Sequence, residues 1–308
     1  MSITVLKPGL QTTVQDLGRN GYAHYGISSS GAADTISLRI GNLLVGNPEE
    51  FAGLEMTILG GTFQFESDAF IAVSGSRFDV LLDGKAFEHQ KGIYVRKGQK
   101  LTIGQTTSGA RCYLCVRGGI EVENYLSGKT THVLTGMGGH YGRALKKGDT
   151  LELGDLKQVK KPILFNQSLD SNYSIIRINK GLQSKWFNNV TWSQFTSEPF
   201  SVSDVSSRMG IRLEGNSIKS SKGNEILTEG IPLGAIQVPG SGGPIISFVE
   251  HQTTGGYPKI ANVISSDLCK VGQLKPGDKF SFQLVSIEEG ESLRLEQESF
   301  IKSLINHD

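Results

Sequence analysis

Residues 234–264 read GAIQVPGSGGPIISFVEHQTTGGYPKIANVI, and this stretch decides the fold class. It contains three short apolar runs, at residues 234–238, 244–249 and 260–264. Each run has the length and the β-branched content of a strand rather than of a helix. The segment PGSGGP at 239–244 predicts a turn that joins the first two strands as a hairpin. No helix or lysine follows this turn, so it is not a phosphate-binding loop.

A polar turn connects the second strand to the third. Glu250 and His251 precede this turn and Lys259 follows it. Two adjacent glycines allow either a positive φ or a close approach of the backbone to a ligand. An acid, an imidazole and an ammonium group around such a turn suit a binding site, but the same residues also suit a tight strand connection with ordinary surface charges. Both interpretations stay open at this point. The turn consists of Gln252, Thr253, Thr254, Gly255, Gly256, Tyr257 and Pro258.

Strand-like runs recur along the rest of the chain. The sequence contains 39 glycines, and turn signals such as Asp83-Gly84 and Lys97-Gly98 separate runs that are rich in β-branched and aromatic residues. This pattern predicts a mainly β protein. The predicted strands cover residues 1–6, 62–65, 70–73, 78–82, 92–95, 101–103, 113–116, 173–178, 199–202 and 206–213.

A few short helices are expected among these strands. Apolar residues recur with helical spacing over 34–45, where Asp34 places a carboxylate near the start and Gly46 supplies a stop signal. A short helix is also predicted within 183–192. The charged segment 288–306 is predicted to form a surface helix.

Length and composition limit the possible functions. The chain has 308 residues, which suits two domains of about 150 residues each, and the polar segment near 155–170 is the expected boundary. With 31 basic and 30 acidic residues, the net charge of +1 gives no basic field for nucleic acid or a membrane surface. No apolar run approaches the roughly 20 residues of a membrane-spanning helix, and the N-terminus does not have the pattern of a signal peptide. A cytoplasmic protein is therefore expected.

Three cysteines are present: Cys112, Cys115 and Cys269. The first two lie three residues apart in a strand-like run, so their side chains are expected on opposite faces of a sheet. That arrangement holds a metal poorly, and no second pair completes a site. We predict buried structural thiols, no disulfide framework and no metal site.

Polar residues also surround the first predicted helix. Asp16 and Arg19 flank a glycine turn, and the loop 28–32, which contains Ser30, leads into the helix N-terminus. The free N–H groups of such a loop can bind an anion. The loop is equally compatible with a simple connection that ends in a helix cap, and the sequence does not decide between the two.

Two other segments carry weaker signals. The glycine-rich segment 136–149 is not followed by the helix that a dinucleotide site requires, and its ending Lys-Lys-Gly-Asp predicts a β-turn. In the second half, Arg208 and Arg212 could face an anionic ligand or simply line a strand. We expect the second role for Arg212 and leave Arg208 open.

Seven of these stretches, taken together and in order, resemble a known family. The family is the allophanate hydrolase subunit 2 family, also called the biotin-dependent carboxyltransferase family, whose members include the C subunit of 5-oxoprolinase as well as KipA. The resemblance runs from about residue 1 to about residue 285. The stretches are residues 13–19, 30–34, 44–48, 142–145, 207–210, 234–239 and 252–258.

The resemblance implies two cyclophilin-like β-barrel domains in tandem, which we place at 1–160 and 161–286, followed by a helix at 287–308. It implies a subunit of an ATP-dependent 5-oxoprolinase that hydrolyses 5-oxoproline to glutamate. Partner proteins of the KipI type and of the LamB/YcsF type are then expected, and this subunit is expected to be inactive alone. The reaction implies ATP with Mg²⁺ as cofactors. The motif for covalently attached biotin is absent, so any biotin would arrive on another protein.

The resemblance also implies site residues. Phosphorylation of the lactam oxygen would make a better electrophile, and that chemistry needs cationic clamps and a carboxylate for Mg²⁺. Alanine at Arg208 or Lys259 is expected to reduce activity far more than stability. The expected catalytic residues are Arg208, Glu250, His251 and Lys259, and the expected binding residues are Asp16, Arg19, Ser30, Gln237 and the turn from Gln252 to Tyr257.

The sequence departs from the family at two points. An Asp and often a basic residue commonly precede the Gln-Thr-Thr run, where this chain has Glu250 and His251. An Asp also commonly precedes the Arg-Met-Gly run, where this chain has Ser207. Two alternative functions follow from the same resemblance. One is a carboxyltransferase that uses biotin on a partner, and the other is a KipA-like regulatory protein that antagonises a KipI-type inhibitor of a sensor kinase.

Overall fold

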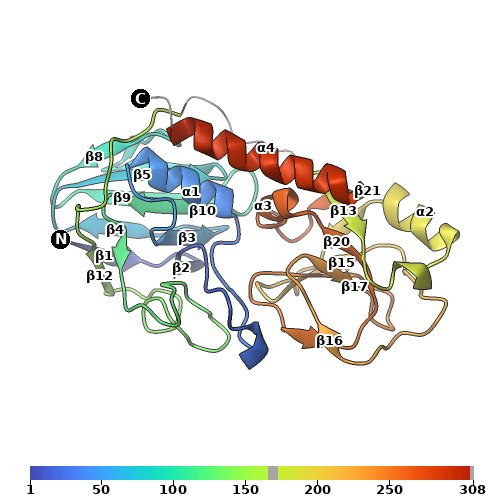
Figure 1. Cartoon of the computed structure of the whole chain (residues 1–308). Helices are drawn as coiled ribbons and strands as arrows, with labels where there is room; N and C mark the ends of the chain where they lie inside the picture. The colour runs from blue at the N-terminus through green and yellow to red at the C-terminus, as the bar shows by residue number, and fades with distance from the viewer. Residues whose placement is uncertain (166–172, 306–308) are drawn as a thin grey trace. The chain divides into compact units, whose positions relative to one another are not determined.

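A computed structural model describes residues 1–165 and 173–305 and divides into two compact units. Of the described residues, unit 1 contains 1–19, 30–165 and 301–305, and unit 2 contains 20–29 and 173–300. The predicted domain limits at 160 and 286 remain a prediction, and residues 166–170 of the expected boundary lie outside the described residues. The predicted mainly β fold is confirmed, with strands in both units (Figure 1).

Unit 1 contains two antiparallel sheets. The larger sheet has the order β11-β12-β1-β4-β9-β6-β7, and the smaller has the order β2-β3-β10-β5-β8. The strands are β1 (Ser2–Lys7), β2 (Gln11–Gln15), β3 (Gly53–Thr57), β4 (Thr62–Phe65), β5 (Ala69–Gly75), β6 (Phe78–Leu82), β7 (Lys85–Ala86), β8 (Ile93–Val95), β9 (Lys100–Thr106), β10 (Arg111–Val116), β11 (Ile120–Glu121) and β12 (Thr150–Leu153).

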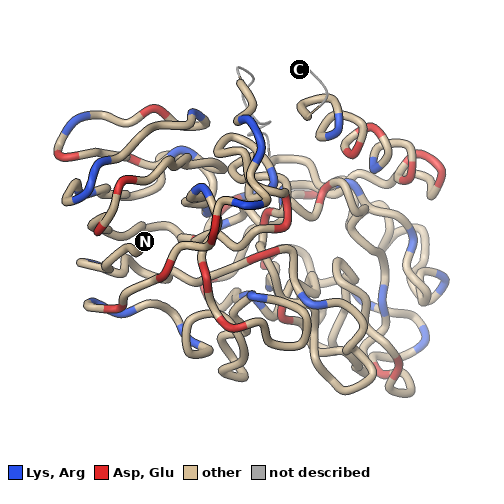
Figure 2. Tube along the Cα trace, turned by 60° about the vertical axis from the view of Figure 1, so that its left-hand side comes forward, with Lys and Arg blue, Asp and Glu red and all other residues tan. Residues whose placement is uncertain are grey.

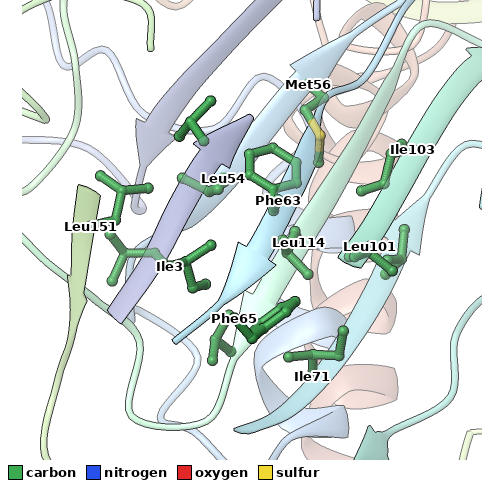
Figure 3. Packing of buried hydrophobic residues seen from close by; sticks show 14 of the residues in the cluster. Ile3, Leu54, Met56, Phe63, Phe65, Ile71, Leu101, Ile103, Leu114 and Leu151 are labelled. Carbon is green, nitrogen blue, oxygen red and sulfur yellow. The ribbon is translucent and has the colours of Figure 1, made fainter. Parts of the chain in front are cut away.

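The core of unit 1 is built from residues that alternate along its strands. Ile3 and Val5 of β1 are fully buried, and so are Phe63 and Phe65 of β4, which pairs with β1. Period-two burial is what a strand with one face toward a core requires. Figure 3 shows how side chains from both sheets, among them Leu54 of β3, meet in one hydrophobic cluster.

Strand β10 is buried along its whole length. It pairs with β3 and β5, and α1 (Thr35–Leu44) packs against β5 and β10 (Figure 1). Cys112 belongs to the core cluster, whereas the Sγ of Cys115 lies 3.8 Å from the carbonyl oxygen of Leu38 in α1. The two thiols therefore lie on opposite faces of the strand, and burial raises the pKa of both. The prediction of buried structural thiols is confirmed.

Unit 2 contains a closed barrel with the strand order β13-β20-β17-β18-β15-β14-β21. The first and last strands of this order, β13 and β21, pair in parallel and close the ring. A separate two-stranded sheet pairs β16 with β19. The strands are β13 (Ile175–Lys180), β14 (Phe200–Val202), β15 (Gly210–Glu214), β16 (Glu229–Gly230), β17 (Ala235–Gln237), β18 (Ile245–Ser247), β19 (Thr254–Gly255), β20 (Lys259–Val263) and β21 (Lys279–Leu284).

The helices agree with the sequence at both ends of the chain. Asp34 caps α1, as its Oδ1 accepts a hydrogen bond of 3.0 Å from the Ser37 N–H. The helix predicted at 288–306 corresponds to α4, and residue 306 lies outside the described residues. The other helices are η1 (Ala23–Tyr25), η2 (Ser184–Trp186), α2 (Asn189–Ser197), η3 (Ser265–Asp267), α3 (Leu268–Val271) and α4 (Ile287–Ile305).

The prediction of one helix within 183–192 was wrong in the extent of that helix. A single 3₁₀ turn, η2, ends before Phe187, whose backbone is extended with φ −112° and ψ 124°. Asn188 then starts α2 by accepting a hydrogen bond of 2.9 Å from the Thr191 N–H. The cap competes with a continuous helix, because it fixes the chain in an extended conformation at the residue where the prediction had a helix interior.

Charged residues of both signs are interspersed along the chain, as Figure 2 shows. Within 1–165 and 173–305, no helix combines the length and the apolar character that a membrane span requires.

Candidate functional site

The polar turn in unit 2 follows from the barrel topology. Strands β18 and β20 both pair with β17 in antiparallel fashion, so the chain must return along the barrel between them. The returning segment carries β19, which pairs with β16 through Glu229↔Gly255 and Gly230↔Thr254. The predicted turn is thus a connection that has its own small sheet. Its polar residues Gln252, Thr254 and Tyr257 are exposed, with Tyr257 at 42%.

Lys259 is the most buried charged side chain of this segment, at 1% exposure. Its Nζ lies 2.6 Å from Oε1 of Glu229 in an ion pair. Gln183 joins the two residues, because its Nε2 donates to the same Oε1 at 2.9 Å and its Oε1 accepts from the Lys259 N–H at 3.0 Å. The Gln183 N–H also donates to the Lys259 carbonyl at 3.1 Å. These four contacts fix one lysine, one carboxylate and one amide as a unit, which we call the Lys259 cluster.

Gln237 lies beside this cluster. It is the Cα partner of Lys259 in the β17–β20 ladder, and its Nε2 donates to the Ser247 Oγ at 3.1 Å. A Cβ added at Gly255 would lie 3.3 Å from the Gln237 Oε1 and 2.5 Å from the Cδ1 of Ile231. The absence of a side chain at Gly255 therefore lets the backbone lie close to Ile231 and Gln237. A positive φ is not needed there, since neither Gly255 nor Gly256 has one.

Arg208 and Glu250 form a second buried ion pair. The Arg208 Nε donates to Oε1 of Glu250 at 2.5 Å, and both side chains are about 95% buried, with exposures of 5% and 3%. The Glu250 N–H also donates to the Arg208 carbonyl at 2.9 Å. The structure thus pairs two of the expected catalytic residues with each other.

The barrel register separates this pair from Lys259. Arg208 precedes β15 and Glu250 follows β18, beyond the end of the ladder where Gly210 pairs with Ser247. Lys259 is level with the other end, where Gln237 pairs with Ile245. Arg208 and Glu250 therefore form one ion pair, and Lys259 forms another with Glu229, so the expected catalytic residues do not gather in one constellation. Arg212, at the end where Gln237 lies, is an exposed strand residue, as expected.

His251 has a defined orientation. Its Nδ1 lies 2.7 Å from the Gln252 carbonyl oxygen, which can only accept, so Nδ1 carries the proton and Nε2 has the lone pair. Burial lowers the pKa of His251, while the hydrogen bond to Gln252 opposes that shift. At neutral pH the imidazole is thus neutral. A neutral imidazole with a basic Nε2 is a suitable general base.

The three expected binding residues of unit 1 meet in a buried polar network. The Asp16 carboxylate accepts from the Gly18 N–H at 2.8 Å and from the Lys129 N–H at 2.5 Å. Arg19 is 1% exposed, and its Nη2 donates to the Thr130 carbonyl at 2.6 Å. Ser30 donates through Oγ to the Thr131 carbonyl at 2.9 Å. All three side chains therefore hold the segment that runs through Lys129, Thr130 and Thr131.

The amides before α1 are already occupied. Four consecutive N–H groups donate within the protein: Gly31 to the Thr130 Oγ1, Ala32 to the Asp16 carbonyl, Ala33 to the Glu55 carboxylate and Asp34 to the Tyr113 hydroxyl. The Tyr113 hydroxyl in turn donates to Glu55 at 2.7 Å. Of the two roles that the sequence left open, the structure favours a capped connection over an anion site.

The glycine-rich segment 136–149 packs against the same network. A Cβ at Gly138 would clash with the Thr130 carbonyl and lie 2.6 Å from the Arg19 Nη2. The predicted β-turn at its end is confirmed, since the Asp149 N–H donates to the Lys146 carbonyl at 3.1 Å. Asp149 also accepts two hydrogen bonds from Arg143, at 2.7 and 2.9 Å, and these hold the pKa of Asp149 at about 2.

Sequence reasoning missed Gln183, Glu229, Glu55 and Tyr113. Glu229 lies in a polar segment without a motif, and Gln183 fell inside a helix prediction. Gln183 lies 46 residues from Glu229 and 76 from Lys259, so no local spacing points to their contact.

The ATP and Mg²⁺ that the family resemblance implies stay a prediction. No group of three or more His, Cys, Asp or Glu side chains gathers within 1–165 and 173–305. The carboxylates of Asp16 and Glu250 are already engaged by protein donors. A Mg²⁺ ion bound with phosphates needs one or two free carboxylates.

Comparison with known proteins gives consistent results. A family model described as carboxyltransferase domain, subdomain A and B, matches residues 25–284. The C subunit of 5-oxoprolinase from Escherichia coli is 36% identical over 308 residues, covering 98% of this chain and 97% of that protein. The C subunit of the Haemophilus influenzae 5-oxoprolinase is 34% identical with the same coverage. The crystal structure of the K. lactis urea amidolyase superposes with a TM-score of 0.92 at 32% identity, covering 98% of this chain and 20% of that one.

Proposed function

The chain belongs to the carboxyltransferase domain family, subdomain A and B, and from this premise we propose that it is a subunit of an ATP-dependent 5-oxoprolinase. The proposed complex opens 5-oxoproline to glutamate, and its other members are a KipI-like protein and a LamB/YcsF-like protein. The observation that carries the proposal is the match with 5-oxoprolinase C subunits from two organisms over nearly the whole length of each chain. A match over one short domain would support the role of a 5-oxoprolinase subunit less strongly.

The site in unit 2 supports an amide substrate. A lactam is resonance-stabilised, so its hydrolysis needs activation of the carbonyl group and a positioned base. The turn presents exposed hydrogen-bonding side chains at Gln252, Thr254 and Tyr257, beside a neutral His251. In this proposal the exposed groups contact the substrate, and Nε2 of His251 accepts a proton from the water that attacks the activated lactam carbonyl.

The two ion pairs of this segment have a structural role in the proposal. Arg208–Glu250 and Lys259–Glu229 hold the two ends of the returning segment in place, so Arg208 acts as a positioning residue. ATP supplies the activation of the lactam oxygen. We assign ATP and Mg²⁺ to the assembled complex.

The test is glutamate release from 5-oxoproline and ATP in mixtures of purified proteins. The chain alone, each pair of proteins and the full three-protein mixture are compared. Turnover in the full mixture only is the expected result. A stable three-protein complex without glutamate release would contradict the proposal.

A second function is favoured by a specific observation. The family is described by carboxyl transfer, and the urea amidolyase contains a region with the fold of this chain over nearly its full length. A carboxyltransferase would take the carboxyl group from biotin on a partner protein. Transfer of labelled carboxylate from a carboxylated biotin carrier to an amide, without glutamate release, would favour this function over the first.

A further inference from the structure

Glu229 in unit 2 uses only one of its two carboxylate oxygens within the protein. Its Oε1 receives both the Lys259 Nζ at 2.6 Å and the Gln183 Nε2 at 2.9 Å. Within the described parts of the chain, Oε2 accepts no hydrogen bond. The side chain keeps 36% of its accessible surface. One oxygen is thus held from inside the protein, and the other is left as an acceptor toward solvent.

The arrangement differs from an ordinary surface ion pair. In a surface pair both side chains are mobile, and the gain in stability is small. Here the lysine is 1% exposed, and Gln183 contacts both its backbone N–H and its carbonyl. Glu229 itself is fixed in β16, opposite Gly255 of β19. The carboxylate therefore has a defined position beside the polar turn.

Glu250, the other acidic residue expected at this site, is not exposed to a ligand as Glu229 is. Glu250 is 4% exposed and bound to Arg208. Glu229 is thus the partly exposed carboxylate that the fold holds next to the turn, although no motif in the sequence marks it.

The charges around Glu229 indicate the class of ligand. Lys259 neutralises the carboxylate, and no cluster of further metal-ligating side chains gathers among the described residues, so a divalent cation is disfavoured. A neutral N–H donor needs an oriented acceptor and no net negative charge. The edge of an amide or lactam provides such a donor.

We propose that Oε2 of Glu229 accepts the N–H of the lactam substrate, and that Lys259 and Gln183 are the positioning residues that orient this carboxylate. The inference rests on the proposed 5-oxoprolinase function and names the residue that recognises the substrate nitrogen. A hydrogen bond to a charged acceptor should improve binding roughly tenfold or more.

The first experiment compares 5-oxoproline with N-methyl-5-oxoproline, which cannot donate from nitrogen. The KM of each compound is measured in the three-protein mixture with the wild-type chain, with Glu229→Gln and with Glu225→Gln. Glu225 is an exposed carboxylate four residues away and serves as the matched control. The wild type and E225Q should prefer 5-oxoproline by about tenfold or more. E229Q should lose most of that preference through a higher KM for 5-oxoproline.

The second experiment tests the positioning role of Gln183. Hydrogen bonds from Lys259 and then from Gln183 lower the pKa of Glu229, and Lys259 is the charged group that faces it. Replacement of Gln183 by Met removes one of these bonds and raises that pKa. The rise in KM for 5-oxoproline on acidification should therefore begin at a higher pH in Q183M than in the wild type. Gln283→Met, at an exposed barrel position, should leave the profile unchanged.

The outcomes separate the inference from the function on which it rests. If the wild-type mixture releases no glutamate, the proposed function and this inference both fail. If it turns over 5-oxoproline but E229Q keeps the wild-type preference between the two lactams, the inference alone is overturned. If the KM for 5-oxoproline begins to rise at the same pH in Q183M as in the wild type, Gln183 is not a positioning residue for Glu229.

Discussion

At the scale of single residues, the Arg208–Glu250 pair changes what a substitution should do. The sequence led us to expect that alanine at Arg208 would reduce activity far more than stability. The structure shows two charges that are about 95% buried and hydrogen-bonded to each other. Removal of one partner leaves the other as an uncompensated buried charge, which is strongly destabilising.

We therefore predict that Glu250→Gln lowers the free energy of unfolding by roughly 3–5 kcal/mol. Urea denaturation followed by circular dichroism measures the change. Glu291→Gln on α4 removes an acid from an exposed ion pair with Arg294 and should leave the midpoint unchanged. A similar midpoint for E250Q and the wild type would show that the pair does not stabilise the fold.

Asp149 gives a pH prediction at the same scale. Its pKa of about 2 in the folded chain lies below its ordinary value of 3.8, chiefly because Arg143 donates to it. The folded state therefore gains stability from this carboxylate above about pH 4 and loses it as the pH falls toward 2. Arg143→Met should flatten that part of the curve of unfolding free energy against pH. An equally steep loss in R143M would mean that other groups cause it.

At the scale of elements, the glycines of the 136–142 segment have a packing role. Gly138 has φ +65°, and a Cβ there would clash with the Thr130 carbonyl, whereas Gly148 has φ +91° and no atom within 4 Å of an added Cβ. Both Gly→Ala substitutions carry the left-handed backbone penalty, roughly 1–2 kcal/mol. We predict that G138A is clearly more destabilising than G148A in thermal unfolding. Equal losses would exclude packing against the Arg19 network as the cause.

Much of the fold could be predicted from local patterns. The strand runs and the helix at 34–45 were found because hydrophobic period and cap residues are local properties of the chain. The extent of the helix predicted at 183–192 was wrong because Asn188 acts as a cap rather than as a helix interior residue. The small sheet of β16 and β19 could not be found from pattern, since each strand is only two residues long.

The site could be predicted only in part, for a related reason. The polar turn and Lys259 were visible in the sequence, because glycines and charges gather there. Its partners were not, since the β16–β19 pairing brings Glu229, and the β13–β20 pairing brings Gln183, to Lys259 from distant parts of the sequence. In unit 1 the polar residues were found, but their engagement with Lys129, Thr130 and Thr131 depends on contacts across more than 100 residues.

At the scale of the whole molecule, the central claim is that this chain completes a 5-oxoprolinase. The family and the length of the match support the role of a subunit, and the two ion-paired groups in unit 2 support a pre-organised site beside the polar turn. A protein that is required for the reaction must limit the rate when it is scarce.

The most direct measurement is a titration of this chain into fixed amounts of the KipI-like and LamB/YcsF-like proteins with 5-oxoproline and ATP. Glutamate release should be absent without the chain, rise with its concentration and saturate at a fixed ratio to the partners. Glutamate release that is independent of this chain, or absent at every ratio although the three proteins form a complex, would contradict the account.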